Sequence, residues 1–246
     1  MSYDIPKPEK HETVGYDRMT AEKYTVGQEQ FFGVDKVTDG ATIAMERTIE
    51  NIQKGQSLGT VYDIGTGSNR EYLRRWQAAT QAKNVIGIEP SAHMRLLSEK
   101  DKREGGPIRV IEGDWRHTSL PDSSADLVVS RFSLHHLKNI SDGYTERARI
   151  LKPGASAVIS LPHPDYCREE LKKKNEEPAE GKPMSVQVFD TTLHYYYHDL
   201  EAYIGENAEK NGLEVVEVDS FNWGTKNSEA ATIPNTLLFV LRKKEN

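Results

Sequence analysis

Short apolar runs alternate with longer amphipathic stretches through the middle of the chain. The apolar runs predict five strands, at residues 60–64, 84–88, 108–111, 126–130 and 155–161. Between them, the spacing of apolar residues predicts helices at residues 69–83, 91–103 and 140–151. The continuous run Leu127-Val128-Val129 is typical of a strand that is covered on both faces. The alternation therefore predicts an α/β fold, with a parallel sheet and helices on both sides.

The two ends of the chain depart from this alternation. A helix is expected at residues 38–54, with Asp39 as its N-cap and Gly55 at its end. After residue 161 we expect a polar stretch, a hairpin and a helix, at residues 162–182, 184–197 and 199–210. Two closing strands follow, at residues 213–221 and 236–242. Their connection is too short for a crossover helix, so the pair is expected to be antiparallel.

Composition narrows the class of protein. Only 36% of the 246 residues are hydrophobic, and the mean hydropathy of -0.68 is very polar. The formal net charge of -6 argues against a nucleic-acid partner, which usually needs a basic face. No apolar run is long enough for a membrane span, and residues 1–8 lack the apolar core of a signal peptide. The single cysteine, Cys167, rules out an intramolecular disulfide, and a cytoplasmic location is expected.

Three successive predicted strands end in an acidic residue. Asp63 closes the first strand and is followed by Gly65 and Gly67, Glu89 closes the second, and Asp114 follows the third. Glycine accepts φ > 0 and has no Cβ, so a loop with two glycines lets the backbone approach a ligand closely. Open α/β sheets bind ligands at the carboxyl ends of their strands. The pattern therefore predicts a ligand site at this edge of the sheet.

The order of these motifs resembles that of class I S-adenosylmethionine-dependent methyltransferases, especially the branch that acts on small molecules. The similarity covers residues 61–161, with weaker agreement in the closing strands. It rests on the segments Asp63-Ile64-Gly65-Thr66-Gly67, Glu89, Gly113-Asp114-Trp115, Leu134-His135-His136-Leu137 and Leu151-Lys152-Pro153-Gly154. The resemblance implies a Rossmann-like, seven-stranded, mostly parallel sheet of order 3-2-1-4-5-7-6, with strand 7 antiparallel. It departs at Asn69, where a third glycine is common.

The resemblance also implies a cofactor, S-adenosyl-L-methionine, with S-adenosyl-L-homocysteine as product. The backbone at Gly65 and Gly67 would contact its methionine part, and Asp63 would lie near its ammonium. Glu89 would accept hydrogen bonds from the ribose hydroxyls, because a carboxylate has several acceptor sites. The adenine would meet the Asp114 carboxylate and the Trp115 backbone N–H.

Two further positions each have two interpretations. Met94 would cover the adenine or pack in the core. Arg131 would pair with the carboxylate of the cofactor or face solvent.

The implied reaction is direct displacement at a sulfonium methyl group, with N, O or C as acceptor. Such a step requires a base only if the acceptor loses a proton. His136, His135 and His163 follow the fourth and fifth strands and are the candidate bases, since histidine titrates near neutral pH. The alternative is that they pack or cap helices. No metal-ligand spacing is present in the sequence.

Substrate selection is expected from two segments outside the sheet. Residues 1–55 would form an N-terminal helical lid, and residues 56–246 the S-adenosylmethionine-binding domain, with a cap inserted at about 162–198. Tyrosines in these segments are candidate substrate contacts: Tyr16, Tyr24, Tyr195 and Tyr197. Tyr195 and Tyr197 share one face of a strand, which lines an acceptor pocket or packs on the sheet.

Three other functions compete with transfer to a small molecule. The first is methylation of RNA or protein, although Ser130-Arg131-Phe132-Ser133 stands where amino-methylating nucleic-acid enzymes carry an asparagine- or proline-based tetrad. The second is cofactor binding without catalysis, because a fold does not fix a function. The third is a nicotinamide-dependent oxidoreductase, which the incomplete G-x-G-x-x-G pattern disfavours. The acceptor and the oligomeric state stay undetermined at this point.

Overall fold

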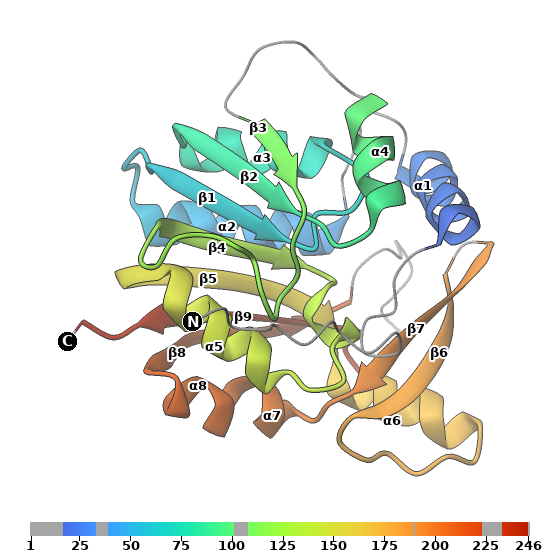
Figure 1. Ribbon diagram of the computed structural model, residues 1–246. Helices are drawn as coiled ribbons and strands as arrows, with labels where there is room; N and C mark the ends of the chain where they lie inside the picture. The colour runs from blue at the N-terminus through green and yellow to red at the C-terminus, as the bar shows by residue number, and fades with distance from the viewer. Residues whose placement is uncertain (1–16, 33–38, 101–107, 189, 223–232, 246) are drawn as a thin grey trace, which may run out of the picture.

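A seven-stranded sheet runs through the centre of the computed structural model, which describes residues 17–32, 39–100, 108–188, 190–222 and 233–245. Its strand order is β3-β2-β1-β4-β5-β9-β8 (Figure 1). The strands are β1 Thr60–Ile64, β2 Asn84–Ile88, β3 Ile108–Ile111, β4 Ala125–Arg131, β5 Leu151–Pro162, β8 Leu213–Phe221 and β9 Thr236–Lys243. The first five strands pair in parallel, and β9 lies antiparallel between β5 and β8. Both the strand order and the antiparallel closing pair are as predicted.

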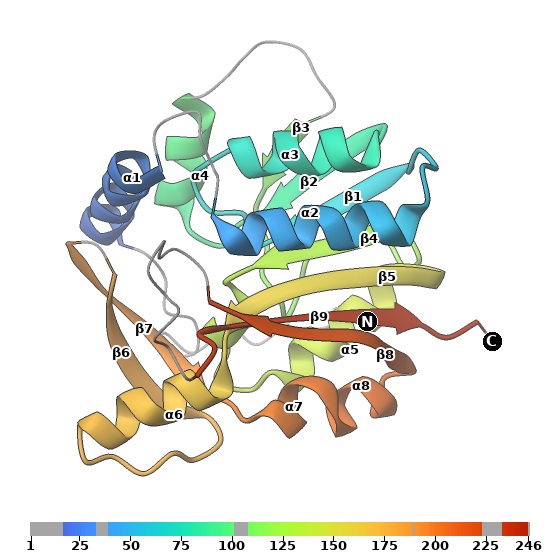
Figure 2. The same ribbon diagram turned by 180° about the vertical axis from the view of Figure 1, so that it is seen from behind.

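Helices cover both faces of this sheet. On one face lie α2 (Gly40–Gln53) and α3 (Glu71–Thr80), which stand in front of the strands in Figure 2. On the other face lie α5 (Ser141–Ile150), α7 (Leu200–Ile204) and α8 (Glu206–Lys210), seen in Figure 1. Side chains alternate along β4: Leu127 and Val129 join the cluster under α2 and α3, while Val128 joins the opposite cluster. The apolar run of β4 is therefore buried on both sides, as its sequence predicts.

The described N-terminal region contains two helices, which lie at different places on the molecule. The helix α2 begins at Asp39, whose Oδ1 accepts the Thr42 N–H at 2.9 Å, and it buries Met45 and Ile49 in the same cluster as β1 and β5. It is thus part of the helical layer on the sheet, whereas the expected lid of residues 1–55 included it. The helix α1 (Arg18–Phe32) lies instead beside α4 (Ala92–Lys100), near the carboxyl ends of the strands (Figure 1).

The insertion after β5 forms a small unit of its own. It consists of α6 (Pro164–Lys173) and an antiparallel hairpin of β6 (Lys182–Val188) and β7 (Thr191–Tyr197), which forms a separate two-stranded sheet. The hairpin is as predicted. The helix expected over residues 199–210 is divided into α7 and α8, because Gly205 adopts φ -99° and ψ -122° there.

Candidate functional site

A cavity opens at the carboxyl ends of the central strands, between α1 and the loops that follow β1, β2 and β4. It holds about 920 Å³ of empty space, including the solvent at its mouth. All eight residues that were predicted to bind the cofactor line it: Asp63, Gly65, Gly67, Glu89, Met94, Asp114, Trp115 and Arg131. This is the edge of the sheet that the three strand-end acids indicated.

The loop after β1 depends on its two glycines in different ways. Both have positive φ, +77° at Gly65 and +68° at Gly67. A Cβ on Gly65 would come within 2.2 Å of the Ser133 Cβ, whereas a Cβ on Gly67 would meet no atom within 4 Å. Gly65 therefore permits a close backbone contact inside the protein, and Gly67 leaves space beside the cavity.

Glu89, at the end of β2, is held by backbone donors. Its Oε2 accepts the Gly67 N–H and its Oε1 accepts the Ser91 N–H, each at 2.9 Å. Burial raises the pKa of this carboxyl to about 6, against the lowering effect of those two donors. A carboxylate offers about four lone-pair positions, so each oxygen can still accept one more hydrogen bond. The geometry fits two neighbouring hydroxyl groups.

Asp63, at the end of β1, has one satisfied and one unsatisfied oxygen. Its Oδ2 accepts from the Thr66 hydroxyl at 3.0 Å and from the Trp76 indole at 3.1 Å. Its Oδ1 is buried and has no hydrogen-bond partner within the described parts of the chain. Burial raises the pKa of this carboxyl to about 6. A buried acceptor that lacks a partner indicates a ligand with a donor, and an ammonium group suits a carboxylate best.

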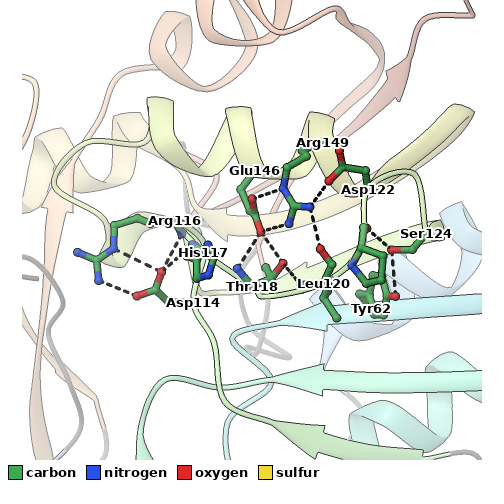
Figure 3. A network of polar contacts seen from close by, with 11 residues as sticks. Tyr62, Asp114, Arg116, His117, Thr118, Leu120, Asp122, Ser124, Glu146 and Arg149 are labelled. Atoms are coloured by element: carbon green, nitrogen blue, oxygen red, sulfur yellow. Dashed lines mark hydrogen bonds and ion pairs between the residues drawn. The ribbon is translucent and has the colours of Figure 1, made fainter. Parts of the chain in front are cut away.

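Asp114 and Trp115 lie in the loop that follows β3, and polar contacts of their side chains hold both in place. Figure 3 shows Asp114 turned toward Arg116, whose Nη2 lies 2.6 Å from Oδ2 and whose backbone N–H donates to Oδ1. Farther along the loop, Thr118 donates to Glu146 of α5, which also accepts from Arg149 of the same helix (Figure 3). The contact between Thr118 and Glu146 fastens the loop to α5. The Trp115 indole donates to the Ser133 hydroxyl at 2.8 Å and is nearly fully buried. Trp115 thus both packs in the core and lines the cavity.

Arg131 and Met94 are the two positions that the sequence left with two interpretations each. The Nη2 of Arg131 lies 3.0 Å from Asp39, its Nε donates to the Thr42 hydroxyl, and its guanidinium stacks on the Tyr72 ring at 4.5 Å. A solvent-facing Arg131 is therefore wrong: its charge is paired with the N-cap of α2. Met94 is 1% exposed and lines the cavity from α4.

Of the three candidate histidines, only His136 reaches the cavity. Its Nδ1 donates to the carbonyl of His194 in β7 at 3.0 Å, and burial lowers its pKa to about 4. The neutral ring, with its proton on Nδ1, has Nε2 as an acceptor. His135 is buried, and its ring meets Tyr195 edge-on at 4.7 Å. His163 caps α6, where its Nδ1 accepts the Asp165 N–H, so the geometry gives neither of these two a place beside a substrate.

The candidate substrate tyrosines are also separated by the structure. Tyr24 in α1 lines the cavity and accepts a hydrogen bond from Gln28. Tyr195 and Tyr197 pack in the small core between β6, β7 and α6. Their shared face therefore does not line the cavity, contrary to the expectation that these two tyrosines contact the substrate. The two side chains pack there because the helix α6 covers this face of the hairpin. Tyr16 lies outside the described residues.

Several cavity residues were not singled out by the sequence: Gln28, Tyr72, Phe132, Ser133 and Leu137. Gln28 lies one helical turn after Tyr24, so spacing on α1 could have identified it. The role of Ser133 had no sequence signal, because its hydroxyl contacts residues far away in the chain, Trp115 and the Ile64 carbonyl.

Two kinds of feature are absent from the described residues. No cluster of three or more potential metal ligands occurs among them. No helix in the described ranges combines the length and the apolar content needed to cross a bilayer.

Comparison with known proteins places this fold in a known group. Residues 62–159 match the family model described as a methyltransferase domain. An uncharacterized methyltransferase of Geobacillus sp. (strain WCH70) is 32% identical over 109 residues, which are 44% of this chain and 48% of that protein. A second such relative, from Anoxybacillus flavithermus, is 33% identical over 111 residues, 44% of this chain and 49% of the relative. The chain thus spans about half the length of these curated relatives.

Solved structures show the same architecture over most of the chain. An S-adenosylmethionine-dependent methyltransferase from Mesorhizobium loti has a TM-score of 0.62 at 19% identity, covering 82% of this chain and 100% of that one. Phosphoethanolamine N-methyltransferase 2 of Haemonchus contortus, solved with S-adenosyl-L-methionine, has a TM-score of 0.65 at 17% identity, covering 94% of this chain and 58% of that one. Residues 62–159 therefore match a methyltransferase domain, and the chain has the fold of solved S-adenosylmethionine-dependent methyltransferases.

Proposed function

We propose that this protein is an S-adenosylmethionine-dependent methyltransferase whose acceptor is a small molecule. One observation carries most of the proposal: the cavity at the strand ends holds two buried carboxylates, Asp63 and Glu89, with acceptor sites still open. The match of residues 62–159 to a methyltransferase domain supports it.

The residues present fit this cofactor. The unpaired Oδ1 of Asp63 suits its ammonium, and Glu89 suits the two hydroxyls of its ribose. The space beside Gly67 admits a ligand close to the backbone. When bound, the cofactor supplies a methyl group on a positively charged sulfur. Such a group needs alignment with its acceptor more than activation by the protein.

His136 is the side chain best placed to orient an acceptor. Its Nδ1 is held by the His194 carbonyl, so the ring orientation is fixed by β7. Its low pKa keeps it neutral near pH 7, where Nε2 accepts a hydrogen bond from an N–H or O–H group. We expect His136 to orient the acceptor, and to be a weak base because its conjugate acid is strong.

The cover of the cavity favours a small acceptor over RNA or protein. The helix α1 closes one side through Tyr24 and Gln28, and the Thr25 hydroxyl meets the Ser68 hydroxyl at 2.6 Å. The formal net charge of -6 disfavours a polyanionic partner. The Haemonchus relative is named for a small amine substrate, phosphoethanolamine. Cys167, the one cysteine of the sequence, is free and buried, which is consistent with the cytoplasm.

Two measurements test the proposal in sequence. Calorimetry with S-adenosylhomocysteine and with NADH tests the cofactor; a clear preference for NADH would refute it. Methyl-labelled S-adenosylmethionine is then incubated with separated pools of small metabolites, RNA and protein, with Glu89→Gln as a binding-deficient control. We expect label in the metabolite pool alone. Label in RNA or protein would refute the acceptor class, and tight binding without any transfer would indicate a non-catalytic binding protein.

A further inference from the structure

Two buried polar atoms without a protein partner belong to residues that line the same cavity. They are Oδ1 of Asp63 and the hydroxyl of Tyr72, and neither has a hydrogen-bond partner within the described residues. Both residues line the cavity. Buried polar groups are almost always paired in folded proteins, so two unpaired groups beside one cavity indicate atoms that a ligand completes.

The helix α3 connects these two residues. Tyr72 and Trp76 are four residues apart and share its buried face. Trp76 donates its indole N–H to Oδ2 of Asp63, which fixes that carboxylate against the helix. Tyr72 lies one turn earlier, at the end of α3 that follows the glycine loop, where the strands end.

The two unpaired atoms have opposite chemical preferences. Oδ1 of Asp63 belongs to a carboxylate and accepts, so it suits a cation. Burial raises the pKa of Tyr72, so its hydroxyl is neutral and can donate. An O–H donor suits an anion, and the Arg131 guanidinium carbon, whose charge is paired with Asp39, lies 4.5 Å from the Tyr72 ring centroid. A cation-binding atom and an anion-binding atom of residues that line one cavity match an α-amino acid, which carries an ammonium and a carboxylate on one carbon.

We propose that the Tyr72 hydroxyl binds the carboxylate of the methyl donor's amino-acid end, and that Tyr72 thereby selects nucleosides that carry this carboxylate. The inference rests on the proposed function. It gives Tyr72 the contact that the sequence suggested for Arg131, which is engaged with Asp39 and Thr42 and lies against the Tyr72 ring.

Three ligands separate the contributions of the two atoms. S-adenosylhomocysteine carries the ammonium and the carboxylate, its decarboxylated analogue keeps only the ammonium, and 5′-methylthioadenosine has neither. By calorimetry, Tyr72→Phe should weaken S-adenosylhomocysteine by about 10- to 100-fold, the scale of a lost hydrogen bond to a charged group, and leave the other two ligands nearly unchanged. Asp63→Asn should weaken the first two ligands and spare the third.

A matched control removes another buried tyrosine hydroxyl. Tyr62 donates to the Ser124 hydroxyl at 3.1 Å and is not among the cavity residues. Tyr62→Phe should bind all three ligands like the wild type. Folding of each variant is checked by urea denaturation.

The outcomes distinguish this inference from the function on which it rests. If Tyr72→Phe binds S-adenosylhomocysteine as the wild type does, or weakens all three ligands equally, the assignment of Tyr72 is wrong and the proposed function stands. If the wild type binds none of the three, both fail. The wild type also gives a test without any variant: equal affinity for S-adenosylhomocysteine and its decarboxylated analogue would overturn the inference.

Discussion

Gly65→Ala should destabilise the protein more than Gly67→Ala, although the two glycines have similar positive φ angles. Their φ angles are +77° and +68°, so alanine at either position takes on the cost of a left-handed residue, about 1–2 kcal/mol. At Gly67 the new Cβ meets no atom within 4 Å, and this cost stands alone. Gly67→Ala should therefore lower the free energy of unfolding by about 1–2 kcal/mol.

At Gly65 a second cost is added. The new Cβ would lie 2.2 Å from the Ser133 Cβ, so one backbone has to move. Ser133 resists moving, because its hydroxyl donates to the Ile64 carbonyl at 2.7 Å and accepts from Trp115. Crowding of this kind costs about 1–3 kcal/mol, which brings the total for Gly65→Ala to about 2–5 kcal/mol.

Urea denaturation followed by circular dichroism measures both costs. The double variant Gly65→Ala with Ser133→Gly isolates the crowding: relative to Ser133→Gly alone, Gly65→Ala should cost only as much as Gly67→Ala does in the wild type. Equal losses for the two single variants would refute the reasoning. So would a cost for Gly65→Ala that Ser133→Gly does not reduce.

Three further predictions concern ligand binding and turnover. Glu89→Gln should weaken S-adenosylhomocysteine by about 2 kcal/mol in calorimetry, because an acceptor for a hydroxyl is lost, while Glu206→Gln on α8 should have no effect. Affinity for S-adenosylhomocysteine should be constant above about pH 7 and fall as the pH drops through 6, because Asp63 and Glu89, with pKa values of about 6, become protonated; Asp63→Asn should make the fall smaller and leave the part due to Glu89. These raised pKa values act on stability in the opposite sense, since the folded protein without ligand binds more protons than the unfolded chain between about pH 4 and 6 and gains stability as the pH falls through that range. His136→Ala should slow turnover and spare cofactor affinity, whereas His163→Ala should affect only thermal stability; an unchanged rate for His136→Ala would exclude it from the reaction.

The sheet could be predicted from sequence because its strands are short apolar runs that end in acids and glycines. The antiparallel closing pair followed from the length of the connection between β8 and β9, and the complete strand order from the resemblance to a family. The docking of α2 could not be predicted. Its apolar face, with Met45 and Ile49, shows that the helix is covered on one side, but the same pattern suits a lid and a helix on the sheet.

The cofactor side of the site was more predictable than the acceptor side. Asp63 lies near the end of β1, Glu89 directly follows β2 and Asp114 lies in the loop after β3, so their place is set by local sequence. The positions of the histidines and of the hairpin tyrosines depend on which elements pack together. Tyr195 faces His135 because β7 lies against the short helix η1 (Leu134–His136), a contact between segments about 60 residues apart.

The two sides of the cavity also differ in how firmly they are built. Hydrogen bonds join the loops on the strand side across the sheet: Ser133 links the ends of β1 and β4 to Trp115, and Glu89 links β2 to the glycine loop. A side whose polar groups already hold one another loses little freedom when a ligand binds, which favours affinity. The opposite side consists of α1, which meets the glycine loop where the Thr25 hydroxyl lies 2.6 Å from the Ser68 hydroxyl, and of η1, which lies against β7. Changes on the strand side should therefore alter affinity for the methyl donor, and changes on α1 or η1 should alter which acceptor is methylated.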